Sequence, residues 1–227
     1  MKNLVTLLFI CAVLGYAVGC INLSFILAKL KGYDIREHGS GNAGASNLMI
    51  TMGKGIGLTV ALIDIMKAYL VTVFSGHLFS ADMVLAQFVC ATFVILGNIF
   101  PFYMGFKGGK GFASLGGSVL AIDIKLFVIL LIIVAVIVFV TDYICFGPIF
   151  ASVAFPISYG AIYRTCIPSV FLLATVAITY RHFENLRRIV QGKELRFSFL
   201  WNRKKEAERL GIEDDGKNYP FGHDNRA

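Results

Sequence analysis

The sequence predicts an all-α integral membrane protein, and three observations lead to that prediction. Of the 227 residues, 57% are hydrophobic and only 15% are charged, and the mean hydropathy is +0.73. A soluble domain is usually about 45–50% apolar and about 25% charged, so this composition implies a large lipid-facing surface. The apolar residues also form long runs, and the lysines and arginines are spread very unevenly among the segments between them.

The apolar runs predict about seven transmembrane helices, with six as the alternative. The first run has no charged residue from Asn3 to Ala28, which is longer than the roughly 7–15 apolar residues of a signal peptide, so we interpret it as a retained span. The run at 111–121 is shorter than the ~20 residues of a full span and predicts a half-helix or a tilted span packed among its neighbours. The runs lie near 3–30, 55–75, 82–105, 111–121, 124–141, 144–163 and 167–183.

The basic residues predict how these spans are oriented. With the N-terminus outside, 17 of the 21 lysines and arginines fall on the cytoplasmic side, whereas Lys2, Lys125 and Arg164 fall outside and Lys67 lies within the second span. Cytoplasmic segments of membrane proteins carry the excess of positive charge. We therefore expect an external N-terminus and a cytoplasmic C-terminus, with a membrane domain at 1–198 and a polar cytoplasmic tail at 199–227.

Three polar segments then share the cytoplasmic face: GYDIREHGSGNAGASN at 32–47, FKGGKG at 106–111 and YRHFENLRRIVQGKE at 180–194. Glycine-rich loops expose backbone N–H groups that bind anions, phosphate most readily. Lys107 and Lys110 add positive charge, and a helix expected after Gly111 directs its positive end to the same place. His182 and Asn185 are three residues apart on a helix and therefore share a face. These segments predict an anion-binding site.

Other interpretations of these residues stay open. Glycines in membrane helices often serve close packing, although packing needs no lysine or carboxamide beside them. Topology and attraction to anionic lipid account for Arg203, Lys204 and Lys205 in the tail. Asp64 and Lys67, three residues apart inside the second span, either neutralise each other or line the site. The five cysteines have no C-x-x-C spacing, and the sequence predicts neither a metal nor an organic cofactor.

Four segments carry a resemblance to a known family, in the same order and spacing: KGYDIREHGSGNAGASN, DIMKA in the second span, GNIFPFYMGFKGGKGFAS and YRHFENLRRIVQGKE. They resemble the bacterial acyl-phosphate:glycerol-3-phosphate acyltransferases, integral membrane enzymes with seven spans, over roughly residues 10–198. The resemblance implies transfer of a fatty acyl group from acyl phosphate to the 1-hydroxyl of sn-glycerol 3-phosphate, giving lysophosphatidate and phosphate in phospholipid synthesis.

The same resemblance implies a location, partners and site residues. The protein would be a multi-pass protein of the bacterial inner membrane whose active site faces the cytoplasm. Its partners would be acyl phosphate, glycerol 3-phosphate, membrane lipids and the soluble enzyme that makes acyl phosphate, with no nucleic acid. The implied catalytic residues are Ser40, Lys110, His182 and Asn185; the implied phosphate ligands are Gly41, Asn42, Gly44, Asn47, Lys107, Gly108 and Gly109; candidates to line the site are Asp64, Lys67 and Asn98.

The implied chemistry needs no covalent acyl-enzyme. An acyl phosphate is already an activated mixed anhydride, so catalysis can depend on positioning and on neutralising negative charge. His182 and Asn185 would orient the acceptor or the leaving phosphate. Two acceptors stay open for the proton of the attacking hydroxyl, His182 and the leaving phosphate.

The chain departs from the family pattern at several positions, which marks a divergent member. An arginine commonly follows the first motif, and Ile50 occupies its position; Asn98 replaces a usual histidine, Ala68 a usual glycine and Cys145 a common serine. A G-S-x-P turn usual in the first span is here Gly19-Cys20-Ile21-Asn22. A catalytically weakened paralogue is therefore one alternative. A transporter of a phosphorylated or organic anion is the other, because broken-helix transporters share the short 111–121 run and the intramembrane ion pair.

Overall fold

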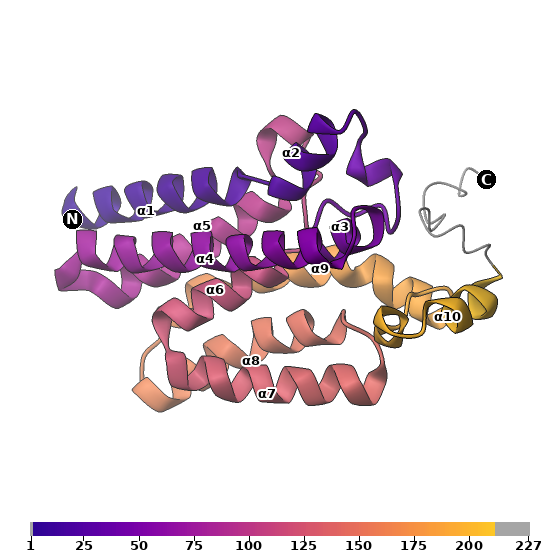
Figure 1. The fold of residues 1–227 in the computed structure, drawn as a ribbon. Coiled ribbons are helices and arrows are strands. Elements are labelled where there is room, and N and C mark those ends of the chain that lie inside the picture. The colour runs from indigo at the N-terminus through magenta and orange to yellow at the C-terminus, as the bar shows by residue number, and fades with distance from the viewer. Residues whose placement is uncertain (1, 212–227) are drawn as a thin grey trace.

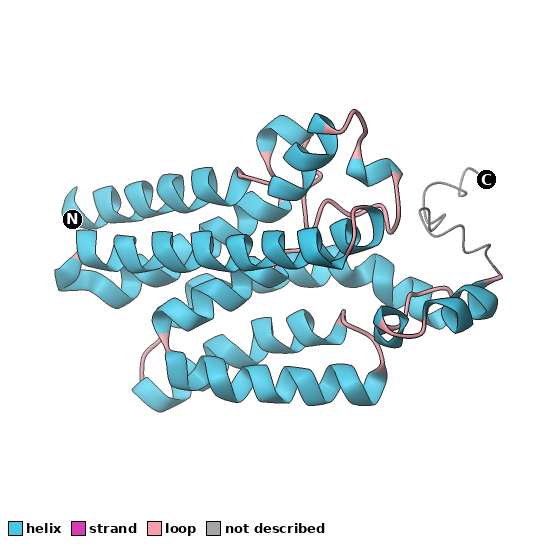
Figure 2. Ribbon diagram, viewed as in Figure 1, coloured by secondary structure: helices cyan, strands magenta, loops and turns pink. Residues whose placement is uncertain are grey.

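The computed structural model describes residues 2–211, and within that range the chain is helical without strands (Figures 1 and 2). The prediction of an all-α protein is confirmed. The helices are α1 Lys2–Cys20, α2 Leu23–Leu30, α3 Ala45–Thr51, α4 Lys54–Leu78, α5 Met83–Ile99, α6 Phe112–Ile122, α7 Ile124–Thr141, α8 Phe146–Tyr163, α9 Leu172–Val190 and α10 Arg203–Leu210. Short 3₁₀ turns are η1 Ile35–Glu37, η2 Ser80–Asp82, η3 Phe102–Met104, η4 Ile167–Phe171 and η5 Phe197–Leu200.

Five segments of the described chain are long and apolar enough to cross a membrane: Leu4–Leu30, Lys54–Leu78, Ser80–Met104, Ile124–Thr141 and Phe146–Tyr163. The two remaining helices of the bundle differ from ordinary spans. α6 is apolar but has only 11 residues, and it packs against α4, α5, α7 and α8, so protein covers it. α9 has 19 residues and carries several charges in its second half. Length and composition thus describe a polytopic membrane protein.

The first apolar run folds as two helices rather than one. α1 ends at Cys20, and Asn22 begins α2 by accepting a hydrogen bond from the Phe25 N–H at 2.9 Å. The Asn22 amide also donates to the carbonyl of Ala43 at 2.9 Å. A proline, usual here in the family that the sequence resembles, has no side-chain donor or acceptor. Asn22 therefore ties the break in the first run to the glycine-rich segment.

α1 packs along α5 more closely than side chains with a Cβ atom would permit. A Cβ placed on Gly19 would lie 2.2 Å from the carbonyl oxygen of Val94, and one on Gly97 would lie 2.3 Å from that of Tyr16. Association of helices in lipid depends on such close contact, because lipid chains are as apolar as the side chains themselves. The glycines in these two helices therefore serve packing.

The core of the bundle is aromatic and lies between α5, α8 and η4. Phe88, Phe155 and Phe171 are fully buried, and their ring centroids lie 5.6–6.2 Å from one another. Because the interior of the bundle is apolar, the polar segments lie at one of its ends. Figure 1 shows α2, α3 and α10 gathered at the end of the bundle opposite the N-terminus of α1.

The described part of the C-terminal tail packs back on the membrane domain. Phe199 of η5 and Ala207 of α10 are 8% and 3% exposed and form a cluster with Ile50 of α3. The composition of the tail predicts a polar segment, and its few apolar residues are the ones that make this contact. Residues 212–227 of the predicted tail lie outside the described range, and the domain boundary at residue 198 stays a prediction.

Candidate functional site

The structure brings the three polar segments together at one end of the bundle. Arg36 pairs with the Asp34 carboxylate at 2.8 Å and donates to the Met104 carbonyl at 2.8 Å, which joins the first segment to the loop before α6. Arg181 of α9 donates to the Gly108 carbonyl at 3.1 Å, which joins the third segment to the same loop. These long-range bonds make one site of segments far apart in the sequence.

The loop before α6 folds back onto the end of α5. The N–H groups of Gly108 and Gly109 donate to the carbonyls of Ile99 and Asn98 at 3.0 and 2.9 Å. A Cβ on Gly108 would lie 2.3 Å from the Asn98 carbonyl oxygen, so only glycine fits. The sequence predicts both glycines as phosphate ligands, but their N–H groups are already used. Their glycine identity instead permits the close approach, and Asn98 supports the loop.

Lys110 is the half-buried cation of this loop. Its ammonium group contacts the side-chain oxygen of Asn185, which lies 75 residues further along the chain. Burial lowers the pKa of Lys110 to about 8, and the charge of Arg188 acts in the same direction, whereas Glu194 opposes the shift. α6 begins directly after Gly111 and directs the positive end of its dipole to this place. Lys107 of the same loop is exposed.

His182 and Asn185 lie about one turn apart on the buried face of α9, and their exposed fractions are 4% and 7%. Nδ1 of His182 lies 2.8 Å from the carbonyl oxygen of Ile178. A carbonyl only accepts hydrogen bonds, so Nδ1 carries a proton, and Nε2 is an acceptor when the ring is neutral. The predicted shared face of these two residues is present in the structure.

Glu194 holds Asn185 in place, a role that the sequence pattern does not predict. Its Oε1 accepts a hydrogen bond from Nδ2 of Asn185 at 2.5 Å, and its Oε2 accepts one from Nε of Arg188 at 2.7 Å. The Asn185 amide is thereby fixed with its oxygen toward Lys110. Arg181 is a second site residue that the sequence pattern does not single out, and its buried Nε has no hydrogen-bond partner in the described chain. Both Arg181 and Glu194 are charged residues of the third polar segment, and this is the sequence feature that marks them as candidates.

Asn47 organises the first polar segment. Its amide donates to the carbonyls of Ile35 and His38, each at 2.9 Å, and its side-chain oxygen accepts from the N–H of Ser40 at 2.7 Å. The N–H of Gly41 donates to the His38 carbonyl at 3.1 Å. The sequence predicts Asn47 and Gly41 as phosphate ligands, but both ends of the carboxamide and this N–H are used within the loop. They shape the segment that carries Ser40.

Asn42 and Gly44 complete this segment. The Oδ1 atom of Asn42 is buried and has no partner among the residues that the structure describes. Gly44 lies against the Asn42 amide, since a Cβ there would be 2.7 Å from its Nδ2 atom. A buried polar atom without a partner is unusual in a folded protein and indicates a place for a ligand.

Asp64 and Lys67 form an ion pair of 2.6 Å within α4. The Lys67 ammonium also donates to the carbonyl of Ile21, which lies in the break between α1 and α2. The pair is therefore engaged in holding that break, which favours a structural role over a place in the site.

Cys145 stands where the family resemblance leads one to expect serine. It is buried directly before α8, and burial raises the pKa of its thiol to about 11. The charge of Glu194 acts in the same direction on the pKa of this thiol, and the charge of Lys110 opposes it.

The fold and the site define a class: a polytopic helical membrane protein that holds a lysine and a network of hydrogen-bonding side chains at one end of its bundle. The family model described as "Glycerol-3-phosphate acyltransferase" matches residues 9–192. The chain belongs to the glycerol-3-phosphate acyltransferase family, and the resemblance found in the sequence is confirmed.

Similar proteins support this assignment over most of their length. The chain is 35% identical to glycerol-3-phosphate acyltransferase 1 of Oceanobacillus iheyensis, over 86% of this chain and 97% of that protein. It is 32% identical to the glycerol-3-phosphate acyltransferase of Bacillus subtilis, over 83% and 96%. A crystal structure of PlsY, an integral membrane glycerol 3-phosphate acyltransferase in its glycerol 3-phosphate form, aligns with a TM-score of 0.76 and 28% identity, covering 85% of this chain and 96% of that one.

Proposed function

We propose that this protein transfers a fatty acyl group from acyl phosphate to the 1-hydroxyl of sn-glycerol 3-phosphate, giving lysophosphatidate and inorganic phosphate. The contact between Lys110 and Asn185 carries the proposal, because it holds a cation where the three polar segments meet. Family membership supports it, as do the two PlsY structures, which are described as the glycerol 3-phosphate form and the lysophosphatidic acid form.

In the proposed reaction, the hydroxyl oxygen attacks the acyl carbonyl carbon, and the bond between that carbon and the phosphate oxygen breaks. The leaving phosphate takes the electron pair of this bond. Lys110 neutralises the charge that develops on it, an effect that is strong where water is excluded. The hydroxyl proton passes to Nε2 of His182, with the leaving phosphate as the alternative acceptor. Asn185, fixed by Glu194, keeps Lys110 in position.

The glycerol moiety is assigned to the first polar segment. The buried Oδ1 of Asn42 is an acceptor, which suits a hydroxyl of the substrate rather than its phosphate. Ser40 lies in the same loop, with its backbone held by Asn47. Arg181, close to the Gly108 carbonyl, is a further cation for phosphate besides Lys110 and Lys107.

We also propose seven spans, with the N-terminus outside and the site facing the cytoplasm of a bacterial cell. The five apolar segments together with α6 and α9 make seven spans. The sequence assigns 17 of the 21 basic residues to the side of the polar segments, which supports the orientation. A soluble enzyme that makes acyl phosphate would meet the protein on this face. Cysteine labelling in intact cells and in inverted vesicles tests the orientation, with single cysteines introduced at Lys125 and at Lys205 in a cysteine-free chain.

The decisive experiment supplies the detergent-purified chain with acyl phosphate and glycerol 3-phosphate and measures phosphate release. We expect release that needs both substrates and that falls by on the order of 10² in Lys110→Ala, because a charge-stabilising group is lost. Lys125→Ala, which removes a cation that is exposed at the far end of the bundle, is the matched control. Absence of release, while the Bacillus subtilis relative is active beside it, would refute the proposal.

The comparisons favour an acyltransferase over the alternative of an anion transporter. The transporter hypothesis predicts uptake of labelled glycerol 3-phosphate into proteoliposomes, and absence of uptake would rule it out. A catalytically weakened paralogue predicts binding of glycerol 3-phosphate without phosphate release, which calorimetry beside the assay distinguishes.

A further inference from the structure

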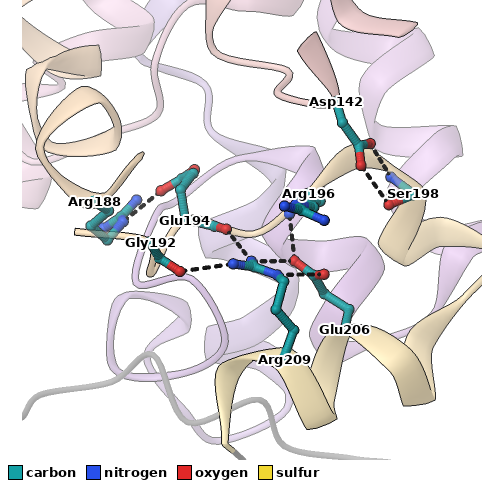
Figure 3. Close-up of polar contacts among 8 residues, drawn as sticks. All are labelled: Asp142, Arg188, Gly192, Glu194, Arg196, Ser198, Glu206 and Arg209. Carbon is teal, nitrogen blue, oxygen red and sulfur yellow. Dashed lines mark hydrogen bonds and ion pairs between the residues drawn. The ribbon is translucent and has the colours of Figure 1, made fainter. Parts of the chain in front are cut away.

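The C-terminal segment 195–211 lies beyond residue 192, where the family match ends, and Arg209 connects it to the site. Nη1 of Arg209 donates to the Gly192 carbonyl at 2.8 Å, and Nη2 donates to the Glu194 carbonyl at 2.7 Å (Figure 3). Both carbonyls belong to the loop that follows α9. One guanidinium thus holds this loop at two points.

The guanidinium of Arg209 is itself held in a fixed orientation. Nε and Nη2 donate to the two carboxylate oxygens of Glu206 at 2.9 and 2.6 Å. Glu206 is 4% exposed, and its carboxylate also accepts from the Arg196 N–H at 2.9 Å (Figure 3). A planar fork paired in this way loses little freedom when it makes its remaining hydrogen bonds. The Arg209 side chain is therefore preorganised on α10 to bind the loop that follows α9.

The segment is anchored to the membrane domain at two further places. Ser198 donates to the Asp142 carboxylate from its N–H and its hydroxyl, each at 2.7 Å, at the end of α7 (Figure 3). At the start of α4, the ammonium of Lys54 donates to the Leu200 carbonyl. Beside it lies the buried cluster of Phe199 and Ala207 with Ile50. Together with the contacts of Arg209, the contacts at Asp142 and at Lys54 make three anchors that fix the segment on the bundle.

The loop that Arg209 holds leads directly to the site. Arg209 binds the main-chain carbonyl of Glu194, and the carboxylate of the same residue accepts from Asn185 and Arg188. Asn185 in turn contacts Lys110. A shift of the Glu194 main chain therefore moves the side chains of Glu194 and Asn185, which orient Lys110.

We propose that segment 195–211 is a built-in positioning element of the site and that Arg209 is its positioning residue. Arg209 acts through Glu194 and Asn185 on Lys110 and touches no substrate. The proposal rests on the proposed function, and it places the control of Lys110 in a part of the chain beyond the family match. Since catalysis of this kind depends on placement, a small displacement is sufficient to lower the rate.

The test uses the full chain with three substitutions: Arg209→Ala, Arg209→Lys and, as the matched control, Lys205→Ala. Lys205 is an exposed cation on the same helix. Hydrogen exchange of peptides spanning 185–195 is measured first, because the N–H groups of Lys193 and Glu194 donate to the Arg188 carbonyl. We expect exchange there to quicken severalfold in Arg209→Ala and to stay unchanged in Lys205→Ala. Unchanged exchange in Arg209→Ala overturns the proposal, whatever the activity of the chain.

Kinetics supply the second measurement. We expect Arg209→Ala to lower kcat by on the order of tenfold while KM for glycerol 3-phosphate changes by less than about twofold, because Lys110 keeps its charge but loses its placement. Arg209→Lys should recover part of the rate, since an ammonium reaches one of the two carbonyls. An equal kcat in Arg209→Ala and the parent, or the same loss of kcat in both Arg209 variants, also overturns it.

The two proposals fail in different ways. If the parent chain releases no phosphate, the proposed function fails, and the exchange measurement still decides whether Arg209 holds the 192–194 loop. If the parent is active and the Arg209 variants match it in both measurements, only the positioning role fails.

Discussion

Asn185 donates from its side-chain amide to the Glu194 carboxylate across 2.5 Å, and its side-chain oxygen receives the Lys110 ammonium. Asparagine has a donor and an acceptor at opposite ends of one planar group, so it joins an anion to a cation without being charged itself. An aspartate could accept from Lys110 but not donate to Glu194. The asparagine therefore keeps the positive charge of Lys110 available for a phosphate.

The substitution Asn185→Asp should weaken the binding of glycerol 3-phosphate. A carboxylate here pairs with Lys110, repels the substrate phosphate and faces the carboxylate of Glu194. We expect KM to rise by on the order of tenfold near pH 7, a loss of roughly 1.4 kcal/mol, with part of it recovered at lower pH as one carboxyl takes up a proton. Steady-state kinetics between pH 5.5 and pH 8 (about the stable range of most proteins) measure this.

Asn202→Asp is the control for that experiment, because it makes the same change of charge at an exposed position just before α10. A KM for Asn185→Asp equal to that of the parent would show that this amide does not govern the charge at Lys110.

The pH dependence of kcat/KM should report the titration of Lys110. Burial lowers the pKa of this lysine from 10.5 to about 8, and a lysine is charged only below its pKa. We therefore expect kcat/KM for glycerol 3-phosphate to fall as the pH rises through about 8. In Lys110→Arg the guanidinium stays charged, so the fall should disappear even though the rate is lower. A parent profile that stays flat up to about pH 10 would contradict the lowered pKa.

Restoring the arginine that the family commonly has should destabilise this chain. Ile50 is 8% exposed and packs with Phe199 and Ala207, so Ile50→Arg places a charge in an apolar cluster and displaces the tail. We expect the unfolding free energy to fall by about 2 kcal/mol or more, with no gain in activity. Thermal unfolding in detergent measures this, with Ser46→Arg on an exposed part of α3 as the control. A lower KM at unchanged stability would instead show that the guanidinium reaches the phosphate.

Gly108→Ala should disturb the loop before α6. Its Cβ would lie 2.3 Å from the Asn98 carbonyl oxygen, so the loop must move away from the end of α5. Overpacking of this kind costs about 1–3 kcal/mol, and we expect lower thermal stability together with reduced phosphate release. Gly55→Ala is the control, because a Cβ there meets no atom within 4 Å and it lies in α4. Equal stability of the two variants would contradict the packing role of Gly108.

The sequence alone predicts the composition-dependent part of this structure. Long apolar runs indicate membrane helices because a segment in lipid must satisfy its own backbone hydrogen bonds, a local property of the chain. The three polar segments and the lysine at position 110 could be recognised in the same way, from residue types close together in sequence. The same local pattern predicts Gly41, Gly108, Gly109 and Asn47 as phosphate ligands, because the partners that their N–H groups and the Asn47 carboxamide find within the loops cannot be recognised from neighbouring residues.

Only the tertiary structure decided which of these groups are free to act. Lys110 meets Asn185, and Asn22 meets Ala43, across long stretches of chain, because packing of α1, α5 and α9 places them together. The tail illustrates the same point: its charges predict a solvated segment, yet Phe199 and Arg209 dock it on the bundle. Composition determines that a chain enters the membrane, whereas the orientation of a single amide or guanidinium depends on contacts that exist only once the helices have packed.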